Sequence, residues 1–486
     1  MISIKDVSFT YDGGQGDGIG NVTLEIAPGE CVLLCGRSGC GKTTVTRLIN
    51  GLIPHFHSGE LQGSVTVGDM DICQTPMYKI AEKVGSVFQN PRTQFFNVDT
   101  DSEIAFGMEN LAYPPEQLRR RLDETAAELE LKELMGRGIF ELSGGEKQKV
   151  AFASIHAMSP EVYILDEPSS NLDVQATEEL RKSLRLLKNK GKTIVIAEHR
   201  LYYLRDLVDR IIYMEGGRIA GSYSPGQFLS LPVAVREGMG LRTMELEAVE
   251  LMEKAPGGAP PPAVLEARKV TVKYKRGPVV DRVELSASRG DIIGVIGHNG
   301  AGKSTFVRTL CGLNKKHEGT FRWNGREVGA KERLRLSYMV MQDVNYQLFA
   351  ESVELECCLG IKNPDREAAA GVLKELDLYG CRQRHPNTLS GGQKQRTAIA
   401  VSMLCKKELL VFDEPTSGLD FDSMRQVAKL LSRLSELGKV IFVVTHDYEL
   451  LAAACSHIVH FDRGALKGGF RTRPRNRKLL QDFFIS

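Results

Sequence analysis

The sequence predicts an α/β protein made of two tandem domains, each with a parallel β-sheet at its core. Three observations predict this: the length of 486 residues, strand-length apolar segments between amphipathic stretches, and a set of motifs that occurs twice in the same order. One hydrophobic core rarely grows to this length, so two or more domains are expected. The composition, 42% hydrophobic and 26% charged, is that of a globular protein.

The internal repeat marks the domains. The matching segments are "ISIKDVSFTY" at Ile2 with "LEARKVTVKY" at Leu265, "GRSGCGKTT" at Gly36 with "GHNGAGKST" at Gly297, and "YILDEPSSNLD" at Tyr163 with "LVFDEPTSGLD" at Leu410. Between the copies, "APGGAPPP" (255–262) is rich in Pro and Gly, which do not continue helices or strands. We therefore expect a first domain at 1–240, a linker at 241–263 and a second domain at 264–486.

The expected strands are near-continuous apolar segments. "CVLLCG" (31–36), "VYILD" (162–166) and "TIVIAEH" (193–199) have the pattern of parallel strands that are buried on both faces. Between two of them, "EELRKSLRLLKNKG" (178–191) has the spacing of an amphipathic helix. Strands that alternate with helices indicate a parallel α/β sheet in each copy. The glycine-rich "DGGQGDGIG" (12–20) is expected to be a flexible loop.

Each copy contains a glycine loop of the form G-x-x-x-x-G-K-[ST], directly after an apolar strand and before a helix. Such a loop wraps phosphate oxygens with backbone N–H groups, while its lysine contacts the terminal phosphates and its hydroxyl binds Mg²⁺. The sequence therefore predicts a bound nucleotide and Mg²⁺, with Lys42, Lys303, Thr43 and Ser304 in these roles. The predicted loop residues are Gly36, Arg37, Ser38, Gly39, Cys40, Gly41, Lys42, Thr43 and Thr44 in the first copy, and Gly297, His298, Asn299, Gly300, Ala301, Gly302, Lys303, Ser304 and Thr305 in the second.

An Asp-Glu pair ends an apolar strand in both copies. In open α/β sheets, ligands bind at the carboxyl ends of the strands. We assign Asp166 and Asp413 to Mg²⁺, and Glu167 and Glu414 to the polarisation of the attacking water.

Further polar residues follow other strands. His199 and His446 come after the next apolar segment and are expected to contact the terminal phosphate. Gln89 and Gln342 end a strand earlier in each copy. A neutral amide can bind water or Mg²⁺ and release it without a charge penalty, which suits a switch.

One tyrosine precedes each glycine loop. Tyr11 in "FTYDGG" and Tyr274 in "VKYKRG" are predicted to stack on adenine.

The segments "LSGGEKQ" and "LSGGQKQ" are expected to open a helix. Exposed N–H groups and the positive end of the helix dipole make a helix start an anion site that needs no lysine. Each copy already has a phosphate loop, so this second anion site must serve a different nucleotide. The residues are Ser143, Gly144 and Gly145 in the first copy and Ser390, Gly391 and Gly392 in the second.

With the glycine loop, the glutamine, LSGG, the Asp-Glu strand, "NLD" or "GLD" and the histidine in this order, the chain resembles a tandem ATP-binding cassette (ABC) ATPase over nearly all of both copies. The resemblance implies two P-loop nucleoside triphosphatase (NTPase) domains, each with a helical signature subdomain. It also implies head-to-tail packing, in which each signature closes over the ATP that is held by the other copy's glycine loop.

The segments around Gln89 and Gln342 indicate the branch of the family. In "FQNPRTQFF" and "MQDVNYQLF", a second glutamine precedes aromatic residues, and "AEHR" in the first copy stands where the second has "THD". These features resemble energy-coupling-factor importer ATPases, although "QDVNYQ" departs from "QNP". The resemblance implies micronutrient uptake with a transmembrane coupling protein and a substrate-capturing membrane protein, from a peripheral position on the cytoplasmic face of the membrane. The candidate partner contacts are Phe95, Phe96, Leu348 and Phe349.

Three other functions remain open: a soluble twin-cassette protein similar to a translation factor, a sugar-importer ATPase and an efflux ATPase. An intact second glycine loop disfavours the sugar type, and the short linker disfavours the translation-factor type. Nucleic acid is not expected as a partner, because 63 Lys and Arg residues nearly balance 61 Asp and Glu residues. The ten cysteines lack zinc-site spacing and are expected to be reduced, and the start of the chain has no signal-peptide pattern.

Overall fold

The computed structural model describes residues 1–13, 18–251, 262–274 and 277–485. It separates into two compact units, one formed mainly by Met1–Met244 and the other by most of the chain from Glu245 onward. We call these the first and second halves and describe each by itself. The predicted flexible loop at 12–20 and the Pro- and Gly-rich segment at 255–262 fall largely outside the described residues.

In the first half, the strands are β1 (Ile2–Tyr11), β2 (Gly18–Ile26), β3 (Cys31–Cys35), β4 (Gly59–Val67), β5 (Met70–Asp71), β6 (Val84–Val87), β7 (Val162–Asp166), β8 (Thr193–Ala197), β9 (Arg210–Glu215) and β10 (Arg218–Tyr223). The helices are α1 (Lys42–Ile49), α2 (Leu52–His55), α3 (Met77–Lys83), α4 (Thr100–Asn110), α5 (Pro115–Glu128), α6 (Gly144–Met158), α7 (Val174–Asn189), α8 (Pro225–Ser230) and α9 (Val233–Gly238).

In the second half, the strands are β11 (Ala263–Tyr274), β12 (Gly277–Ser288), β13 (Ile292–Ile296), β14 (Glu318–Trp323), β15 (Arg326–Glu327), β16 (Ser337–Val340), β17 (Leu409–Asp413), β18 (Val440–Val444), β19 (His457–Asp462) and β20 (Ala465–Arg471). The helices are α10 (Lys303–Leu310), α11 (Ala330–Leu336), α12 (Val353–Cys358), α13 (Arg366–Glu375), α14 (Gly391–Leu404), α15 (Phe421–Glu436), α16 (Tyr448–Ala454) and α17 (Arg477–Ile485).

The predicted parallel sheets are confirmed, except that the edge strands β10 and β20 pair antiparallel with β9 and β19. Over the described residues, the larger sheet has the strand order β10-β9-β3-β8-β7-β6 in the first half and β20-β19-β13-β18-β17-β16 in the second. Strand β3 pairs in parallel with β8 and β9, and β7 pairs in parallel with β6 and β8. This order brings the carboxyl ends of β3, β7 and β8 to one edge, where the glycine loop, the Asp-Glu pair and the histidine follow them.

A smaller antiparallel sheet, which the sequence did not reveal, covers one face of the larger sheet in the first half. Its order is β2-β1-β4-β5, and β12-β11-β14-β15 is its equivalent in the second half. Along β3, Cys31, Leu33 and Cys35 belong to one buried cluster, whereas Val32 and Leu34 belong to the cluster shared with β1, β2 and β4. This alternation explains the continuous apolar segment, because both faces of β3 are buried.

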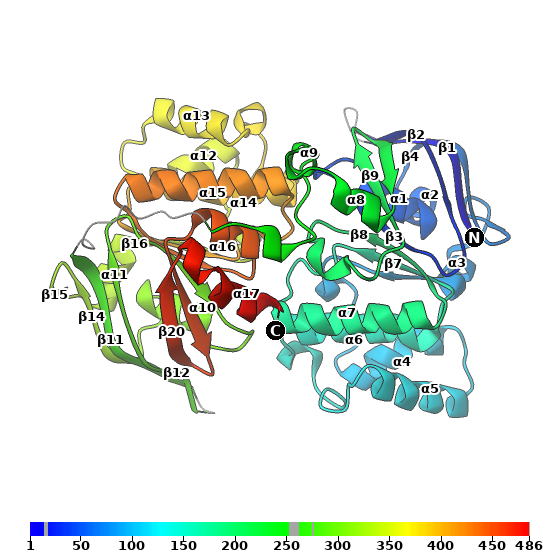
Figure 1. The fold of residues 1–486 in the computed structure, drawn as a ribbon, viewed down its shortest axis with the longest axis horizontal. Helices are drawn as coiled ribbons and strands as arrows, with labels where there is room; N and C mark the ends of the chain where they lie inside the picture. The colour runs from blue at the N-terminus through cyan, green and yellow to red at the C-terminus, as the bar shows by residue number, and fades with distance from the viewer. Residues whose placement is uncertain (14–17, 252–261, 275–276, 486) are drawn as a thin grey trace. The chain divides into compact units, whose positions relative to one another are not determined.

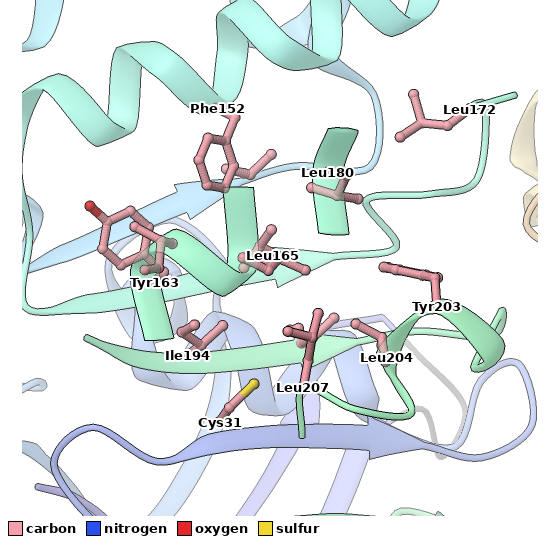
Figure 2. Close-up of a cluster of buried hydrophobic side chains, with 14 of the residues drawn as sticks. Cys31, Phe152, Tyr163, Leu165, Leu172, Leu180, Ile194, Tyr203, Leu204 and Leu207 are labelled. Carbon is pink, nitrogen blue, oxygen red and sulfur yellow. The ribbon is translucent and has the colours of Figure 1, made fainter. Parts of the chain in front are cut away.

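Figure 2 shows part of the cluster on the other face of that sheet, where side chains of α6, β7 and β8 meet. The rings of Phe152 and Tyr163 stack with their centroids 6.4 Å apart. This contact joins the signature helix α6 to the strand that ends in the Asp-Glu pair.

A group of helices connects β6 to β7 in the first half and β16 to β17 in the second (Figure 1). In the first half, α4, α5 and α6 contact one another, and in the second half α12, α13 and α14 do so. In the part of the chain that the structure describes, no helix is long and apolar enough to cross a membrane. All ten cysteines are free, and most are buried.

Candidate nucleotide-binding sites

Both glycine loops have the backbone geometry that the motif predicts. Gly36 and Gly297 have φ angles of 146° and 145°, and a Cβ atom there would collide with the carbonyl oxygens of Met214 and Phe461. Only glycine fits such a position. The loops lead directly into α1 and α10, so the backbone N–H groups of the helix starts point toward the space for phosphate.

The two loop lysines are buried and folded onto their own loops. Lys42 Nζ donates to the carbonyl oxygens of Gly36 and Arg37, both at 3.0 Å. Lys303 Nζ donates to those of Gly297 and His298, the latter at 2.9 Å. These bonds hold each ammonium group inside the loop where terminal phosphates are expected.

The loop hydroxyls lie beside the predicted Mg²⁺ carboxylates. Thr43 Oγ1 donates to Asp166 Oδ1 at 3.2 Å, and Ser304 Oγ donates to Asp413 Oδ1 at 3.4 Å. Burial raises the pKa of both aspartates. A hydroxyl and a carboxylate at this spacing are hard oxygen ligands of the kind that Mg²⁺ prefers, so the residues present fit the ion.

The predicted catalytic glutamates share an unusual backbone conformation. Glu167 and Glu414 have φ angles of 46° and 51°, in the left-handed region that non-glycine residues rarely adopt. The N–H groups of the two glutamates donate to Ala197 and Val444, both at 2.8 Å, which ties each glutamate to the end of the adjacent strand. Burial, and then the charge of Asp166, raises the pKa of Glu167 to about 7.

The two glutamates accept hydrogen bonds from different neighbours. Gln89 Nε2 donates to Glu167 Oε2 at 2.6 Å. In the second half, Glu414 Oε2 accepts from Thr445 Oγ1 at 3.2 Å and from the N–H of His446 at 3.4 Å. Gln342 lies two residues past β16, as Gln89 does past β6.

The two histidines lie equally close to the glutamates. His199 Nε2 is 3.5 Å from Glu167 Oε1, and His446 Nε2 is 3.6 Å from Glu414 Oε1. Burial, and then the charge of Lys42, lowers the pKa of His199. A neutral imidazole therefore lies beside Glu167, and the His446 ring lies at the equivalent place beside Glu414.

The signature segments open helices as expected. Ser143 is the N-cap of α6 and Ser390 is the N-cap of α14. Each serine accepts from the N–H group three residues later, and the side chains of Glu146 and Gln393 accept in return. These are capping boxes, and the spacing S-x-x-[EQ] could have predicted them.

The second glutamine after each predicted switch closes a small loop. Gln94 accepts from the N–H of Phe88 at 3.3 Å and donates to the carbonyl of Ser86 at 3.0 Å. Gln347 accepts from the N–H of Met341 at 2.8 Å and donates to Met339 O. In both halves, the side-chain amide of this glutamine thus makes the two hydrogen bonds that close the loop, one with a backbone N–H group and one with a backbone carbonyl.

A buried glutamate that sequence reasoning missed supports the following residues. Glu103 accepts from the N–H groups of Phe96 and Asn97 at 3.0 and 2.8 Å. Its equivalent Glu356 accepts from Phe349 and Ala350, both at 2.7 Å. Both carboxyl groups are buried, and no recognised motif contains them, so only the fold reveals their role.

In each half, the backbone that the buried glutamate holds carries one aromatic side chain that points to solvent. Phe96 and Phe349 are both 73% exposed, whereas Leu348 is buried and Phe95 packs against the core. Of the four predicted partner contacts, two are therefore available at the surface.

The two tyrosines differ. The Tyr11 hydroxyl lies 3.2 Å from Thr44 Oγ1 and accepts from Arg47 at 3.1 Å. Tyr274 is 56% exposed. Stacking on adenine stays a prediction for both.

Two phosphate loops, each with a hydroxyl–aspartate pair, a largely buried glutamate and a histidine at the same sheet edge, define a protein with two P-loop nucleoside triphosphatase (NTPase) domains. The family model of the ABC transporter matches residues 19–170 and 280–417. The chain belongs to this family, binds ATP and is an ATPase.

Relatives agree over nearly the whole chain. Two proteins of Treponema denticola that are provisionally named ABC transporter ATP-binding proteins are 47% and 38% identical. The first match covers 96% of both chains and the second 97% of both. A solved structure titled as a model of ribosome-bound archaeal Pelota and ABCE1 has a TM-score of 0.71 at 20% identity, over 97% of this chain and 80% of that one. At this identity the likeness shows the fold alone.

Proposed function

We propose that the chain is the ATP-hydrolysing subunit of a membrane transporter and powers the uptake of a micronutrient, a vitamin or a metal ion. Its partners in this proposal are a transmembrane coupling protein and a substrate-capturing membrane protein. The chain works as a peripheral protein at the cytoplasmic face of the membrane.

In the proposed reaction, each glycine loop binds the phosphates of one ATP. Thr43, Asp166 and Gln89, or their equivalents in the second half, would hold Mg²⁺, which would supply positive charge to neutralise the phosphates. Glu167 polarises the attacking water, and His199 contacts the terminal phosphate. The left-handed backbone and the buried surroundings support this assignment, because both hold the carboxylate of Glu167 in one place.

We also propose that the two sites are completed crosswise. Ser143, Gly144 and Gly145 close over the ATP of the second loop, and Ser390, Gly391 and Gly392 close over the ATP of the first. The capped start of each signature helix supports this, because it offers backbone N–H groups that can bind an anion. The glycine loop of the same half already provides a phosphate site with its own lysine, so the signature can serve the nucleotide of the other half.

The observation that carries the transport proposal is the exposed ring after each switch glutamine. Phe96 and Phe349 occupy equivalent positions, are equally exposed, and are held by equivalent buried glutamates. Large apolar side chains that are presented on rigid backbone are typical of docking sites. A partner that binds them is coupled directly to Gln89 and Gln342 through the loops that Gln94 and Gln347 close.

A soluble twin-cassette function is the competing proposal. The likeness to the ABCE1 chain in a ribosome-bound complex extends over nearly all of this chain, but it concerns the fold alone. The two proposals differ in the partner that the exposed rings would bind.

The test is co-expression of the chain with the membrane proteins encoded beside it, followed by membrane fractionation. We expect the wild-type chain to fractionate with membranes only when these partners are present. The double variant Phe96→Asp and Phe349→Asp should lose this association, because a carboxylate cannot be buried in an apolar interface without a large cost.

Leu437→Asp is the matched control, since Leu437 is 64% exposed but lies at the end of α15, away from both switch glutamines in sequence. This control should keep wild-type membrane association and ATP turnover. Association of the wild-type chain with ribosomes in place of membranes would reject the transport proposal and favour the soluble one.

A further inference from the structure

The residue before the switch histidine differs between the halves. Glu198 precedes His199, whereas Thr445 precedes His446. Each residue directly follows an equivalent strand, β8 or β18, and both are buried, Glu198 with 2% of its surface exposed and Thr445 with none. A buried carboxyl group in the position of a hydroxyl requires a reason, because burial of an unpaired charge is costly.

The contacts of Glu198 lead to the segment that follows the catalytic carboxylates. Glu198 Oε1 accepts a short hydrogen bond from the Ser169 hydroxyl. Arg200, on the other side of the histidine, donates to the carbonyl oxygens of Ser169 at 3.4 Å and Leu172 at 3.2 Å. The residues on both sides of His199 therefore hold the segment Ser169–Leu172.

In the second half the same connections are made by different residues. Thr445 donates to the catalytic Glu414, and Thr416, the equivalent of Ser169, donates to Asp447 Oδ2 at 2.7 Å. The carboxylate that holds this segment thus follows the histidine in the second half and precedes it in the first. Glu198 makes the connection that Asp447 makes in the other copy.

We propose that Glu198 is a positioning residue of the first ATP site, where its carboxyl group ties the segment Ser169–Leu172 to the switch histidine His199. The hydrogen-bonded pair fixes how this segment follows Glu167, and so it holds the predicted base in place without touching ATP. This role concerns ATP hydrolysis itself and does not depend on the nature of the transport partner.

The surroundings of Glu198 favour its neutral form. Among the described residues, the ionisable groups that face it are Glu167, Arg200 and Tyr203, and Figure 2 shows Tyr203 packed within the buried cluster. Burial raises the pKa of Glu198 to about 8, the Ser169 hydrogen bond lowers it in part, and the charge of Glu167 raises it again. Glu198 Oε2 is buried without a hydrogen-bond partner among the described residues.

Ionisation of Glu198 would change this arrangement. A second negative charge beside Glu167 repels that carboxylate, and it attracts the Arg200 guanidinium away from the carbonyl oxygens of Ser169 and Leu172. The segment should therefore loosen as the pH rises through about 8, the pKa that burial gives Glu198.

The test compares Glu198→Ala and Glu198→Gln in the full chain by hydrogen–deuterium exchange and ATP turnover. At pH 7, Glu198→Ala should speed exchange in Ser169–Asp173 by about fivefold, the equivalent of one lost hydrogen bond. It should lower kcat by a similar factor with little change in KM for ATP, and Glu198→Gln should restore both values. The segment Thr416–Leu419 of the second half is the internal control and should not change.

The pH dependence separates positioning from mere packing. At pH 9 the wild-type segment should exchange faster than that of Glu198→Gln, because only the wild type ionises, whereas at pH 7 the two should agree. The proposal would be overturned if the wild type and Glu198→Gln exchanged at the same rate at pH 9 as well as at pH 7. A Glu198→Gln variant as impaired as Glu198→Ala would also overturn it. Wild-type exchange and turnover in Glu198→Ala would also overturn it.

Discussion

The two halves hold the predicted catalytic carboxylate by different hydrogen bonds. Glu167 accepts from Gln89, which belongs to the predicted switch loop, whereas Glu414 accepts from Thr445 and from the N–H of His446. The backbone of the two glutamates is nevertheless alike, with both in the left-handed region. The repeat thus preserves the position of the predicted base and varies the residues that donate hydrogen bonds to it.

This difference has a functional consequence. In the first half, any movement of the switch loop acts directly on Glu167 through a side-chain hydrogen bond of 2.6 Å. In the second half, the donors to Glu414 lie on the segment of the switch histidine. We expect the first site to respond most strongly to a docked partner, and the second to respond to the γ-phosphate that its histidine is proposed to contact.

The largest expected effect tests whether both carboxylates act as bases. Glu167→Gln and Glu414→Gln should each reduce ATP turnover by at least about a hundredfold, the usual contribution of general base catalysis. ATP binding should stay intact, because neither side chain belongs to a phosphate loop. Steady-state turnover and equilibrium binding of ATP to the two variants provide the measurement.

Near-normal turnover in one of the two variants would show that its site is not needed for hydrolysis. The comparison would then be between a catalytic half and a regulatory half. Reduced ATP binding in a variant with a folded core would instead place the glutamate in the binding site.

A smaller effect tests how each carboxylate is held. Gln89→Ala removes a short, charge-assisted hydrogen bond and should lower turnover by about tenfold. Thr445→Val removes the hydroxyl that donates the longer bond to Glu414 and that also accepts from the N–H of Asp447 at 3.1 Å, so we expect a loss of about threefold. Steady-state ATP turnover of both variants provides the comparison.

Thr445→Ser is the matched control, because it keeps the hydroxyl that donates to Glu414. It should retain wild-type turnover. A Thr445→Ser variant as slow as Thr445→Val would show that packing of the methyl group is what matters, and would contradict the assigned hydrogen bond.

The sequence predicted the parts of each site that motifs encode. The glycine loops, the Asp-Glu pair and the signature helix start were all recognisable, since phosphate binding requires those residue types at that spacing. The left-handed backbone of Glu167 was not predictable, because glutamate has no preference for it and the bond from its N–H to Ala197 O depends on the pairing of β7 with β8. The roles of Glu103 and Gln94 were also hidden, since both act on backbone groups of a loop that no motif defines.

The difference between Glu198 and Thr445 was visible in the sequence, but its meaning was not. "AEHR" and "THD" show that the flanking residues change, whereas only the structure shows that Ser169 bonds to the residue before the histidine and Thr416 to the residue after it. Side-chain direction at a strand end depends on the tertiary environment, which the local sequence does not describe.

The smallest expected effect concerns the end of the chain, which contacts the phosphate loop of the second half. In α17, the ring of Phe483 lies 5.6 Å from that of His298 and 4.9 Å from that of His460, measured between centroids. His298 belongs to the glycine loop, so this helix supports the loop from outside. Phe483→Ala should therefore weaken nucleotide binding by the second loop by about two- to threefold, the loss of one aromatic contact.

The measurement is titration with a fluorescent ATP analogue in a Lys42→Ala background, in which binding to the first loop is impaired and the second loop dominates the signal. Leu479→Ala is the control on the same helix, since Leu479 is 53% exposed, and it should bind as the background does. A Phe483→Ala variant that binds the analogue as tightly as the Leu479→Ala control would show that the helix covers the loop without supporting it. If Phe483→Ala alone weakens binding of the analogue, the two halves differ in a second way. The second ATP site would then depend on a helix that follows the repeated motifs.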